Sequence, residues 1–293
     1  MARIRPENAN LTLELELREI RGEIAAAGLA VSSQHTYSEV LRRFELFLRH
    51  GLGVGNLHEI SREHVARFVR APPEAPAVHV SVATMHTRRA ALRLAFRIAR
   101  ERGLLDHDPT LDLNLARRKG TRCRPLDWGE IERCRSASVH SIGETRLPAA
   151  WALAEATATS PEIALIRPND VDLYRRRVRL FGGGHLMSRW GDLTEWGAEQ
   201  IDRRMQLQDD RTAGLVYRGH GSANSAQASV SQAIRWSLVR AGLGADPSVK
   251  PSSIRGWRAR SWADEGVPVQ EIAARLGMRS LDRVIALIVD DGR

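Results

Sequence analysis

The sequence has few aromatic residues, two cysteines and no long apolar run. Aromatic residues make up 5% of its 293 residues, which favours a helical protein over an all-β sandwich or barrel. Cys123 and Cys134 match no metal-ligand spacing and no disulfide framework, so we expect a reducing, cytoplasmic setting. No apolar stretch reaches the roughly 20 residues that span a bilayer. The first residues also lack the pattern of a signal peptide, so we expect no membrane partner.

Lysine is nearly absent, although the chain is basic. Lys119 and Lys250 are the two lysines among 44 basic residues, and the net charge is +9. Arginine presents a planar fork that pairs with phosphate and with guanine edges. Most of the excess positive charge lies in residues 1–124, with 21 basic against 14 acidic residues. This composition indicates a globular protein whose expected partner is nucleic acid.

The first part of the chain predicts a small helical domain. Apolar residues at helical spacing predict helices over 9–28, 33–50, 60–70 and 81–103, with Ser61 as an N-cap and Gly51 as a stop. Leucines at alternating positions inside 9–28 are a strand-like feature of the first helix. We place the domain at residues 1–116 and a basic linker at 117–126. The linker carries Arg117, Arg118, Lys119, Arg122 and Arg124. It is either a solvated connector or an arm along a phosphate backbone.

The second part, residues 127–293, predicts a mainly helical domain with a small β-hairpin or sheet. Helices are expected over 127–137, 145–158, 194–206, 222–244, 253–266, 269–277 and 280–291. A short helix leads into a strand over 160–173. Residues 178–194 predict a hairpin with Gly182–Gly184 at its turn, and residues 214–217 predict a strand.

Three segments carry a resemblance to a known family. Residues 81–113, 155–173 (EATATSPEIALIRPNDVDL) and 251–287 (PSSIRGWRARSWADEGVPVQEIAARLGMRSLDRVIAL) occur in the order of the tyrosine recombinase (phage integrase) motifs, with the glycine hairpin between the last two. The resemblance implies a two-domain clamp around duplex DNA. It would consist of a SAM-like helical core-binding domain and an α+β catalytic-type domain.

The resemblance also implies where catalytic residues should lie. The family uses a tyrosine nucleophile, two arginines, a lysine, a histidine, and a histidine or tryptophan. The second arginine is present as Arg255. The other positions hold Thr159, Gly183, Ser252, Met278 and Leu287. None of the three tyrosines, Tyr37, Tyr174 and Tyr217, follows Arg255. We therefore expect the recombinase fold without the recombinase reaction. Arg255 either forms an ion pair with Asp170 or Asp172 or contacts a phosphate.

Two predicted helices supply candidate DNA contacts. On 81–103, Arg89, Arg93, Arg97 and Arg100 recur at helical spacing with Arg88 nearby, and no acidic residue precedes Glu101. On 222–244, the outer side presents Ser225, Gln227, Ser229, Ser231, Gln232 and Arg235, which are side-chain types that read base edges. Either helix could instead present an ordinary solvated face. Further phosphate candidates are Arg175, Arg176, Arg177, Arg179, Arg189, Arg258 and Arg260. Trp190, Trp196, Trp257 and Trp262 are expected in the core.

These observations predict a non-catalytic, sequence-specific double-stranded DNA-binding protein. It would act as a transcriptional repressor or regulator, or as an accessory factor, of a phage or mobile element. Self-association or an active recombinase is a further possible partner, and no cofactor or metal is expected. Six residues follow Leu287, so we do not expect a tetramer held by exchanged tails. The alternatives are an active tyrosine recombinase with a rearranged site and a protein-interaction module.

Overall fold

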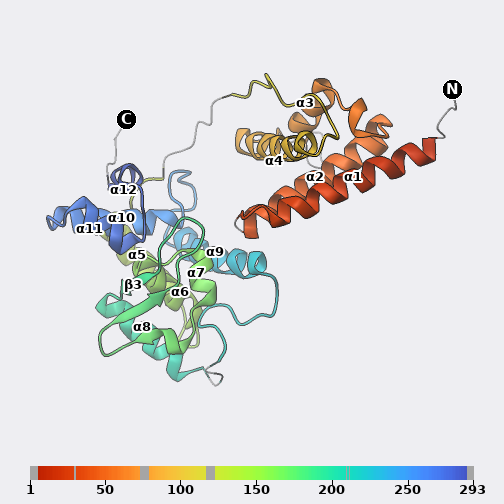
Figure 1. The fold of residues 1–293 in the computed structure, drawn as a ribbon. Helices are drawn as coiled ribbons and strands as arrows, with labels where there is room; N and C mark the ends of the chain where they lie inside the picture. Colours follow the sequence, from red (N-terminus) through yellow and green to blue (C-terminus); the bar gives the residue numbers. More distant parts are fainter. Residues whose placement is uncertain are drawn as a thin grey trace, which may run out of the picture. The chain divides into compact units, whose positions relative to one another are not determined.

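The chain forms two compact units, residues 1–120 and 121–293. The computed structural model describes residues 6–29, 31–72, 79–116, 123–208, 210 and 212–288, and side chains from residue 12 onward except 31 and 32. The division falls inside the predicted linker 117–126, of which residues 117–122 lie outside the described part. Figure 1 shows the elements of each unit, and each unit is described here by itself.

The first unit is a bundle of helices α1 (Pro6–Ala26), α2 (Val31–Leu52), α3 (Arg62–Arg70) and α4 (Val82–Glu101), with a short 3₁₀ turn, η1 (Leu57–Glu59). The leucines of α1 follow helical spacing, not a strand pattern. Leu13, Leu17 and Ile20 are buried, whereas Leu15 is 45% exposed. The alternating leucines therefore lie on opposite faces of one helix, and the inner face packs on α2 and α4.

Local capping residues set the helix ends in this unit. The Ser61 side chain accepts a bond from the His64 backbone N–H at the start of α3, as predicted. The Ser81 side chain accepts from the Thr84 N–H at the start of α4. The predicted stop at Gly51 is wrong by two residues. α2 continues to Leu52, and Gly53, with φ of 66°, ends it, because the left-handed conformation at a helix end favours glycine.

The second unit contains α5 (Trp128–Ser138), α6 (Arg146–Glu155), α7 (Ser160–Leu165), α8 (Glu195–Gln206), α9 (Ala223–Arg240), α10 (Ser252–Asp264), α11 (Val269–Leu276) and α12 (Leu281–Ile288). A 3₁₀ turn, η2 (Pro168–Asp170), leads into β1 (Val171–Asp172). This strand pairs antiparallel with β2 (Arg177–Leu180), which pairs with β3 (Arg189–Asp192). The predicted fold class, mainly helical with a small β-hairpin sheet, is confirmed.

The predicted strand over 214–217 is wrong. Leu215 and Val216 are buried, which explains their apolar pattern, but the segment has no strand partner among the described residues. Its Leu215 N–H donates to the Ile166 carbonyl at 2.9 Å. Short apolar runs are buried in irregular segments as well as in strands, so their pattern alone does not identify a strand.

The core of the second unit surrounds α6, whose Trp151 is fully buried. A smaller core joins α10, α11 and α12. Trp257 and Trp262 are buried as predicted, and Trp196 packs partly buried against the main core. Trp190 is 46% exposed, which contradicts the prediction. Its ring lies under the Arg177 guanidinium at 4.2 Å, so a cation–π contact covers it instead of core packing.

No helix among the described residues is long and apolar enough to cross a bilayer.

Candidate nucleic-acid interface around Arg255

A cleft of about 290 Å³ lies between the start of α7, α9 and the start of α10. It is lined by Ala154, Ala158, Thr159, Ser160, Pro161, Gln227, Ser231, Ile234, Pro251, Ser252 and Arg255. The fold thus gathers three positions that the family motifs single out, Thr159, Ser252 and Arg255. It also places beside them Gln227 and Ser231, two of the predicted base-reading residues. Sequence positions almost 100 residues apart meet in one polar cleft.

Arg255 is the cation of this cleft. It is half-buried, and its Nη2 donates to the Leu276 carbonyl at 2.8 Å. Its Nε is buried and has no acceptor among the described residues. Burial, together with the nearby charge of Arg189, lowers the pKa of Arg255 to about 10, against the opposing effect of Glu162. The guanidinium remains charged at neutral pH and has spare donors.

The predicted ion pair of Arg255 with Asp170 or Asp172 is wrong. The Asp170 carboxylate accepts a bond from the Arg167 backbone N–H. Asp172 instead pairs with the arginines of the β1–β2 turn, Arg175 at 3.5 Å and Arg177 at 3.3 Å. Within the described residues no carboxylate lies within ion-pair distance of Arg255. An anion from outside the chain is therefore a suitable partner for it.

Glu162 organises the wall of the cleft. Its buried carboxylate accepts bonds from the Thr159 N–H and hydroxyl, both at 2.8 Å, and from the Gly182 N–H at 3.1 Å. Arg189, whose side chain is 6% exposed, donates to it at 2.8 Å. Burial would raise the pKa of Glu162, but the bonds from Arg189 outweigh it and the pKa falls.

Arg189 is therefore a support inside the protein. It also donates from Nη2 to the Thr157 carbonyl at 2.8 Å and from Nη1 to the Met187 carbonyl at 3.2 Å. The prediction that Arg189 contacts DNA is wrong because its guanidinium is enclosed by Glu162 and backbone carbonyls. Thr159, the counterpart of the first family arginine, is likewise held by Glu162 as the N-cap of α7.

The glycine turn after β2 rests on the junction of α11 and α12. Gly182 has φ of 74°, and a Cβ there would lie 2.6 Å from the Leu186 carbonyl oxygen, so the turn requires glycine. The Met187 N–H donates to the Gly277 carbonyl at 2.9 Å, and Leu186 bridges to Met278. Gly183, the counterpart of the family lysine, also lies in this turn.

The other family positions hold packing residues. Leu287 and Met278 pack partly buried against the core of α10–α12. The Ser252 hydroxyl lies 3.1 Å from the Cys123 sulfur. Tyr217 accepts a bond from the Gly221 N–H, and Tyr174 is 96% exposed on the β1–β2 turn. No tyrosine, lysine or histidine is among the described residues that line the cleft.

The outer face of α9 continues the cleft. Gln227, Ser231 and Arg235 follow one another at four-residue spacing, with Gln227 and Arg235 exposed and Ser231 half-buried. Gln232 is also exposed. Ser229 belongs to the inner side, because its hydroxyl accepts a bond from Arg146 at 2.8 Å. Ser225 is exposed near the start of the helix, where its hydroxyl bonds with that of the N-cap Ser222.

The arginines of α4 divide into two groups. Arg93 and Arg97 are exposed, and Arg97 lies 3.8 Å from Glu101. Arg89 is half-buried, and its Nε has no acceptor among the described residues. Arg100 lies 3.6 Å from Asp108. The exposed part of the predicted stripe is therefore present, with partial neutralisation near its end.

Arg88 does not belong to that stripe, and its assignment as a DNA contact is wrong. Its side chain is buried, and Nη1 donates to the Phe68 and Ala71 carbonyls at 2.9 and 2.6 Å. These carbonyls lie at the end of α3, where the Phe68 carbonyl also accepts the Ala71 N–H at 3.1 Å, so Arg88 caps that helix. Burial accordingly lowers the pKa of Arg88.

Three other predicted contacts have partners within the second unit. Arg177 pairs with Asp172 and lies on Trp190. Arg258 lies over Trp257 and Trp262, at 5.8 and 5.1 Å from the ring centres. Arg124, predicted on a linker arm, is tied to Glu130 and Asp246. Arg117, Arg118, Lys119 and Arg122 lie outside the described residues.

Sequence reasoning missed Glu162 as the organiser of the cleft. Thr159 and Glu162 have the spacing of a capping box, which was the available signal. Its pairing with Arg189, 27 positions away, has no such signal. Among the described residues, no three His, Cys, Asp or Glu side chains come together as a metal site requires.

Comparison with known proteins gives no match to a family model and none to a curated protein sequence. Several solved structures are similar. A lambda integrase dimer bound to a COC' core site matches with TM-score 0.69 and 17% identity over 99% of this chain and 83% of that one. Lambda integrase residues 75–356, bound to the same site, give TM-score 0.70 and 17% identity over 96% and 97% of the two chains.

A third similar structure is the Tn1549 transposon integrase in complex with a circular intermediate DNA. It matches with TM-score 0.66 and 13% identity over 94% of this chain and 95% of that one. Because the sequence identities are low, these similarities concern the fold alone. They agree with the order of helices and the three-stranded sheet described above, and the chain has the tyrosine recombinase fold.

Proposed function

We propose that this protein binds double-stranded DNA sequence-specifically and neither cuts nor joins strands. Its role would be that of a transcriptional regulator or of an accessory factor of a phage or mobile element. The proposal rests chiefly on the cleft around Arg255. There Arg255, a half-buried cation that has no carboxylate partner among the described residues, lies beside a polar helix face. Leu287, at the position of the family nucleophile, packs against an apolar core.

Arg255 would contact a phosphate and fix the register of the protein on the duplex. The N–H donors of the Arg255 guanidinium suit a bidentate contact with a phosphate. The phosphate would also supply the acceptor that its Nε lacks among the described residues. The exposed α9 residues Gln227 and Arg235 would then reach base edges, since glutamine pairs with adenine and arginine with guanine. Arg93 and Arg97 of α4 would add phosphate contacts.

Among the described residues that line the cleft, no tyrosine lies next to Arg255, which supports the non-catalytic part of the proposal. The cleft contains the hydroxyls of Thr159, Ser160, Ser231 and Ser252, but the Thr159 hydroxyl donates to Glu162. No histidine or lysine among the described residues of the cleft is placed to take a proton from the others. A bound phosphate would be held there but not attacked.

Trapping on a nicked suicide substrate tests the non-catalytic claim. Binding sites would first be located by genome-wide footprinting of the tagged protein in its host. Mobility shift on an enriched site is expected to show reversible, salt-sensitive binding, because counterions are released from each contacted phosphate. A protein–DNA adduct that survives denaturation would overturn the proposal in favour of a recombinase with a rearranged site.

The position of the site would define the biological role. A site that overlaps a promoter supports regulation, whereas one beside an attachment core supports an accessory role. Equal affinity for the enriched site and for random duplex of the same length would contradict sequence specificity. Specific complexes are typically about 10³-fold or more tighter than non-specific ones.

A further inference from the structure

Another cleft lies on α10, formed with the segment 124–128 and with α8. One part, of about 700 Å³, is lined by Arg124, Pro125, Leu126, Asp127, Trp128, Trp257, Arg260, Ser261, Asp264 and Glu265. A neighbouring part, of about 570 Å³, shares Trp128, Trp257, Ser261 and Glu265 with it and adds Arg135, Thr194, Glu195, Trp196, Glu199 and Arg258. The shared residues make these parts one continuous surface, which we call the tryptophan cleft.

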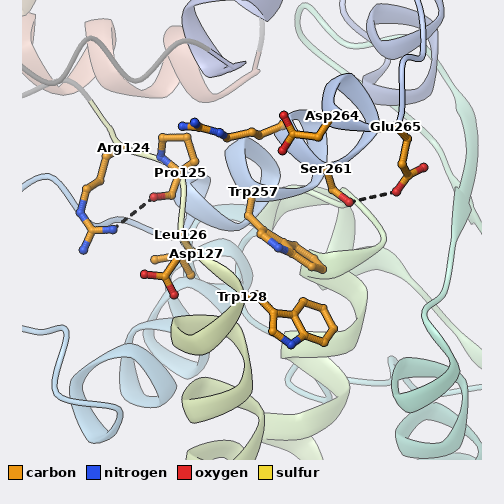
Figure 2. A pocket seen from close by; sticks show the side chains of 10 residues that line it. Arg124, Pro125, Leu126, Asp127, Trp128, Trp257, Ser261, Asp264 and Glu265 are labelled. Atoms are coloured by element: carbon orange, nitrogen blue, oxygen red, sulfur yellow. Dashed lines mark hydrogen bonds between the residues drawn. The ribbon is translucent and has the colours of Figure 1, made fainter.

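Aromatic rings form the floor of the tryptophan cleft. Trp128 is 59% exposed, although it is the first residue of a well-capped helix. Its ring lies 6.0 Å from that of Trp257, with 35° between the planes, and Figure 2 shows the two rings beside each other below Ser261. A large exposed indole, supported from behind by a buried one, is unusual on a free surface and typical of a binding surface.

Carboxylates form the rim. Asp127, Glu195, Glu199, Asp264 and Glu265 all line the cleft and are all exposed. None of these five has a cationic side chain within 4 Å among the described residues. Asp127 caps α5 through the Glu130 N–H, and Glu265 accepts only the Ser261 hydroxyl. The rim is therefore acidic, on a chain whose net charge is +9.

The arginines of the cleft leave this rim largely uncompensated. Arg124 is held by Glu130 and Asp246, and Arg135 by two other carboxylates, Glu132 and Glu155. The two remaining arginines have no carboxylate within ion-pair distance in the described part of the chain. Arg258 lies against the Trp257 and Trp262 rings, and Arg260 is exposed. Two cations against five free carboxylates leave the surface negative.

Most α10 residues of the tryptophan cleft lie on the side of the helix opposite Arg255, whereas Arg258 lies about 60° from it. An α-helix turns 100° per residue, so Arg260, Ser261 and Asp264 point about 140° to 240° away from Arg255. The cleft is thus separate from the candidate DNA interface. Its acidic rim would also repel phosphate, so its ligand is neither the duplex bound at Arg255 nor another nucleic acid.

We propose that the tryptophan cleft docks an arginine-rich segment of a partner protein. Arg135 lies over the Trp128 ring at 5.2 Å from its centre, and Trp257 lies beside it. An incoming guanidinium would stack on the part of the ring that these two residues leave exposed, where cation–π attraction is worth about 1 kcal/mol. The rim carboxylates, in particular Glu199 and Glu265, would pair with the arginine fork. The Nε of Arg258 is buried without an acceptor among the described residues, and a carbonyl of the docked segment would complete its bonding.

The test is calorimetric titration of the full chain with a short oligo-arginine peptide at physiological salt. We expect one saturable site per chain. Trp128→Ala should weaken binding about fivefold, which corresponds to the cation–π term above. The triple change Glu195→Gln, Glu199→Gln and Glu265→Gln should weaken it at least about tenfold. Trp236→Ala is the matched control, since Trp236 is 50% exposed on α9, and should bind like the wild type.

Several results would overturn this proposal. These are equal binding by wild type and Trp128→Ala, equal loss in Trp236→Ala, preference for oligo-glutamate, or equal affinity for oligo-lysine, which cannot stack as a planar fork. Duplex binding, measured on the same preparations, should be unchanged in Trp128→Ala. That readout also shows that the variant is folded and separates failure here from failure of the DNA proposal.

Discussion

Two arginines three positions apart on α10 lie in different settings. Among the described residues Arg255 has no carboxylate partner, and it lies among hydroxyls and small residues beside the polar face of α9. Arg258 lies on the tryptophan cleft, against two indole rings and beneath an acidic rim. One residue type on one helix is thus prepared for an anion in one setting and held within a cation-attracting surface in the other.

The comparison shows that the role of an arginine in this protein depends on its surroundings and not on its residue type. Burial lowers the pKa of both Arg255 and Arg258, so burial does not distinguish them. The lining does, because hydroxyls and amides accept a phosphate as neighbour whereas carboxylates do not. Counting arginines in a basic sequence therefore overestimates the number that face nucleic acid.

The largest expected effect comes from removing the support on the Arg255 side. Arg189→Ala leaves the buried carboxylate of Glu162 without its cation, which should lower the free energy of unfolding by about 3–5 kcal/mol. Urea denaturation at neutral pH measures it. Arg179→Ala, which removes an exposed arginine on β2, should change stability by less than about 0.5 kcal/mol.

A double variant sharpens this result. Glu162→Gln in the Arg189→Ala background removes the unpaired charge and should restore part of the lost stability. A single Arg189→Ala variant that is as stable as wild type but has lost DNA affinity would contradict our view of Arg189 as a support. It would return Arg189 to the phosphate contacts.

The next largest expected effect distinguishes Arg255 from Arg258. Arg255→Ala should weaken duplex binding about 10- to 100-fold, since a charge-assisted bond to phosphate contributes about 1.5–3 kcal/mol. It should also reduce the slope of log affinity against log salt by about one. Arg258→Ala should change duplex affinity by about twofold or less. Equal losses in the two variants would show that DNA contacts both arginines.

A substitution on the α9 face should have a smaller effect, and one that depends on the DNA sequence. Gln227→Ala is expected to reduce discrimination at one base pair of the enriched site by about 1–3 kcal/mol while non-specific affinity stays the same. Competition among single-base variants of the site measures it. Asn224→Ala, an exposed change near the start of α9, is the control. A uniform loss over all sequences would instead make Gln227 a backbone contact.

Much of the fold was predictable because local signals agreed. Ser61 caps α3 as predicted, and Asp127, Thr194 and Ser222, the first residues of three predicted helices, cap α5, α8 and α9. The predicted strand at Leu215 failed because burial, without pairing, produces the same short apolar run. The hairpin prediction was correct because three consecutive glycines with positive φ permit the turn.

The site was predictable in position but not in contacts. Family motifs located Thr159, Ser252 and Arg255, which the fold brings into one cleft. They could not show that Arg88 turns inward to cap α3 or that Arg189 pairs with Glu162, since both depend on partners 17 or more positions away. Trp128 follows an N-cap, where sequence gives no sign that an indole stays exposed.

The smallest expected effect is a loss of stability at acid pH, at the wall of the tryptophan cleft. Asp246 holds Arg124 at 2.9 Å, and Arg124 precedes the segment that carries Trp128. Bonds from Ser248, then from Arg124, lower the pKa of Asp246 to about 2 from an ordinary 3.8. A lowered folded-state pKa means that this carboxylate stabilises the fold above about pH 4 and loses that contribution as pH falls toward about 2.

Asp246→Asn isolates this contribution. The variant should be slightly less stable than wild type at about pH 5, and the difference should shrink as pH falls through the pKa of Asp246. Urea denaturation at a series of pH values measures both curves. Asp264→Asn, which changes an exposed carboxylate on the rim without a cationic partner among the described residues, is the control at about pH 5 and should change stability there by less than about 0.5 kcal/mol. Because Asp246 is only partly buried, its effect is smaller than that of Glu162. A pH-independent difference would mean that Arg124 is held by Glu130 alone, and the wall of the tryptophan cleft would then not depend on Asp246.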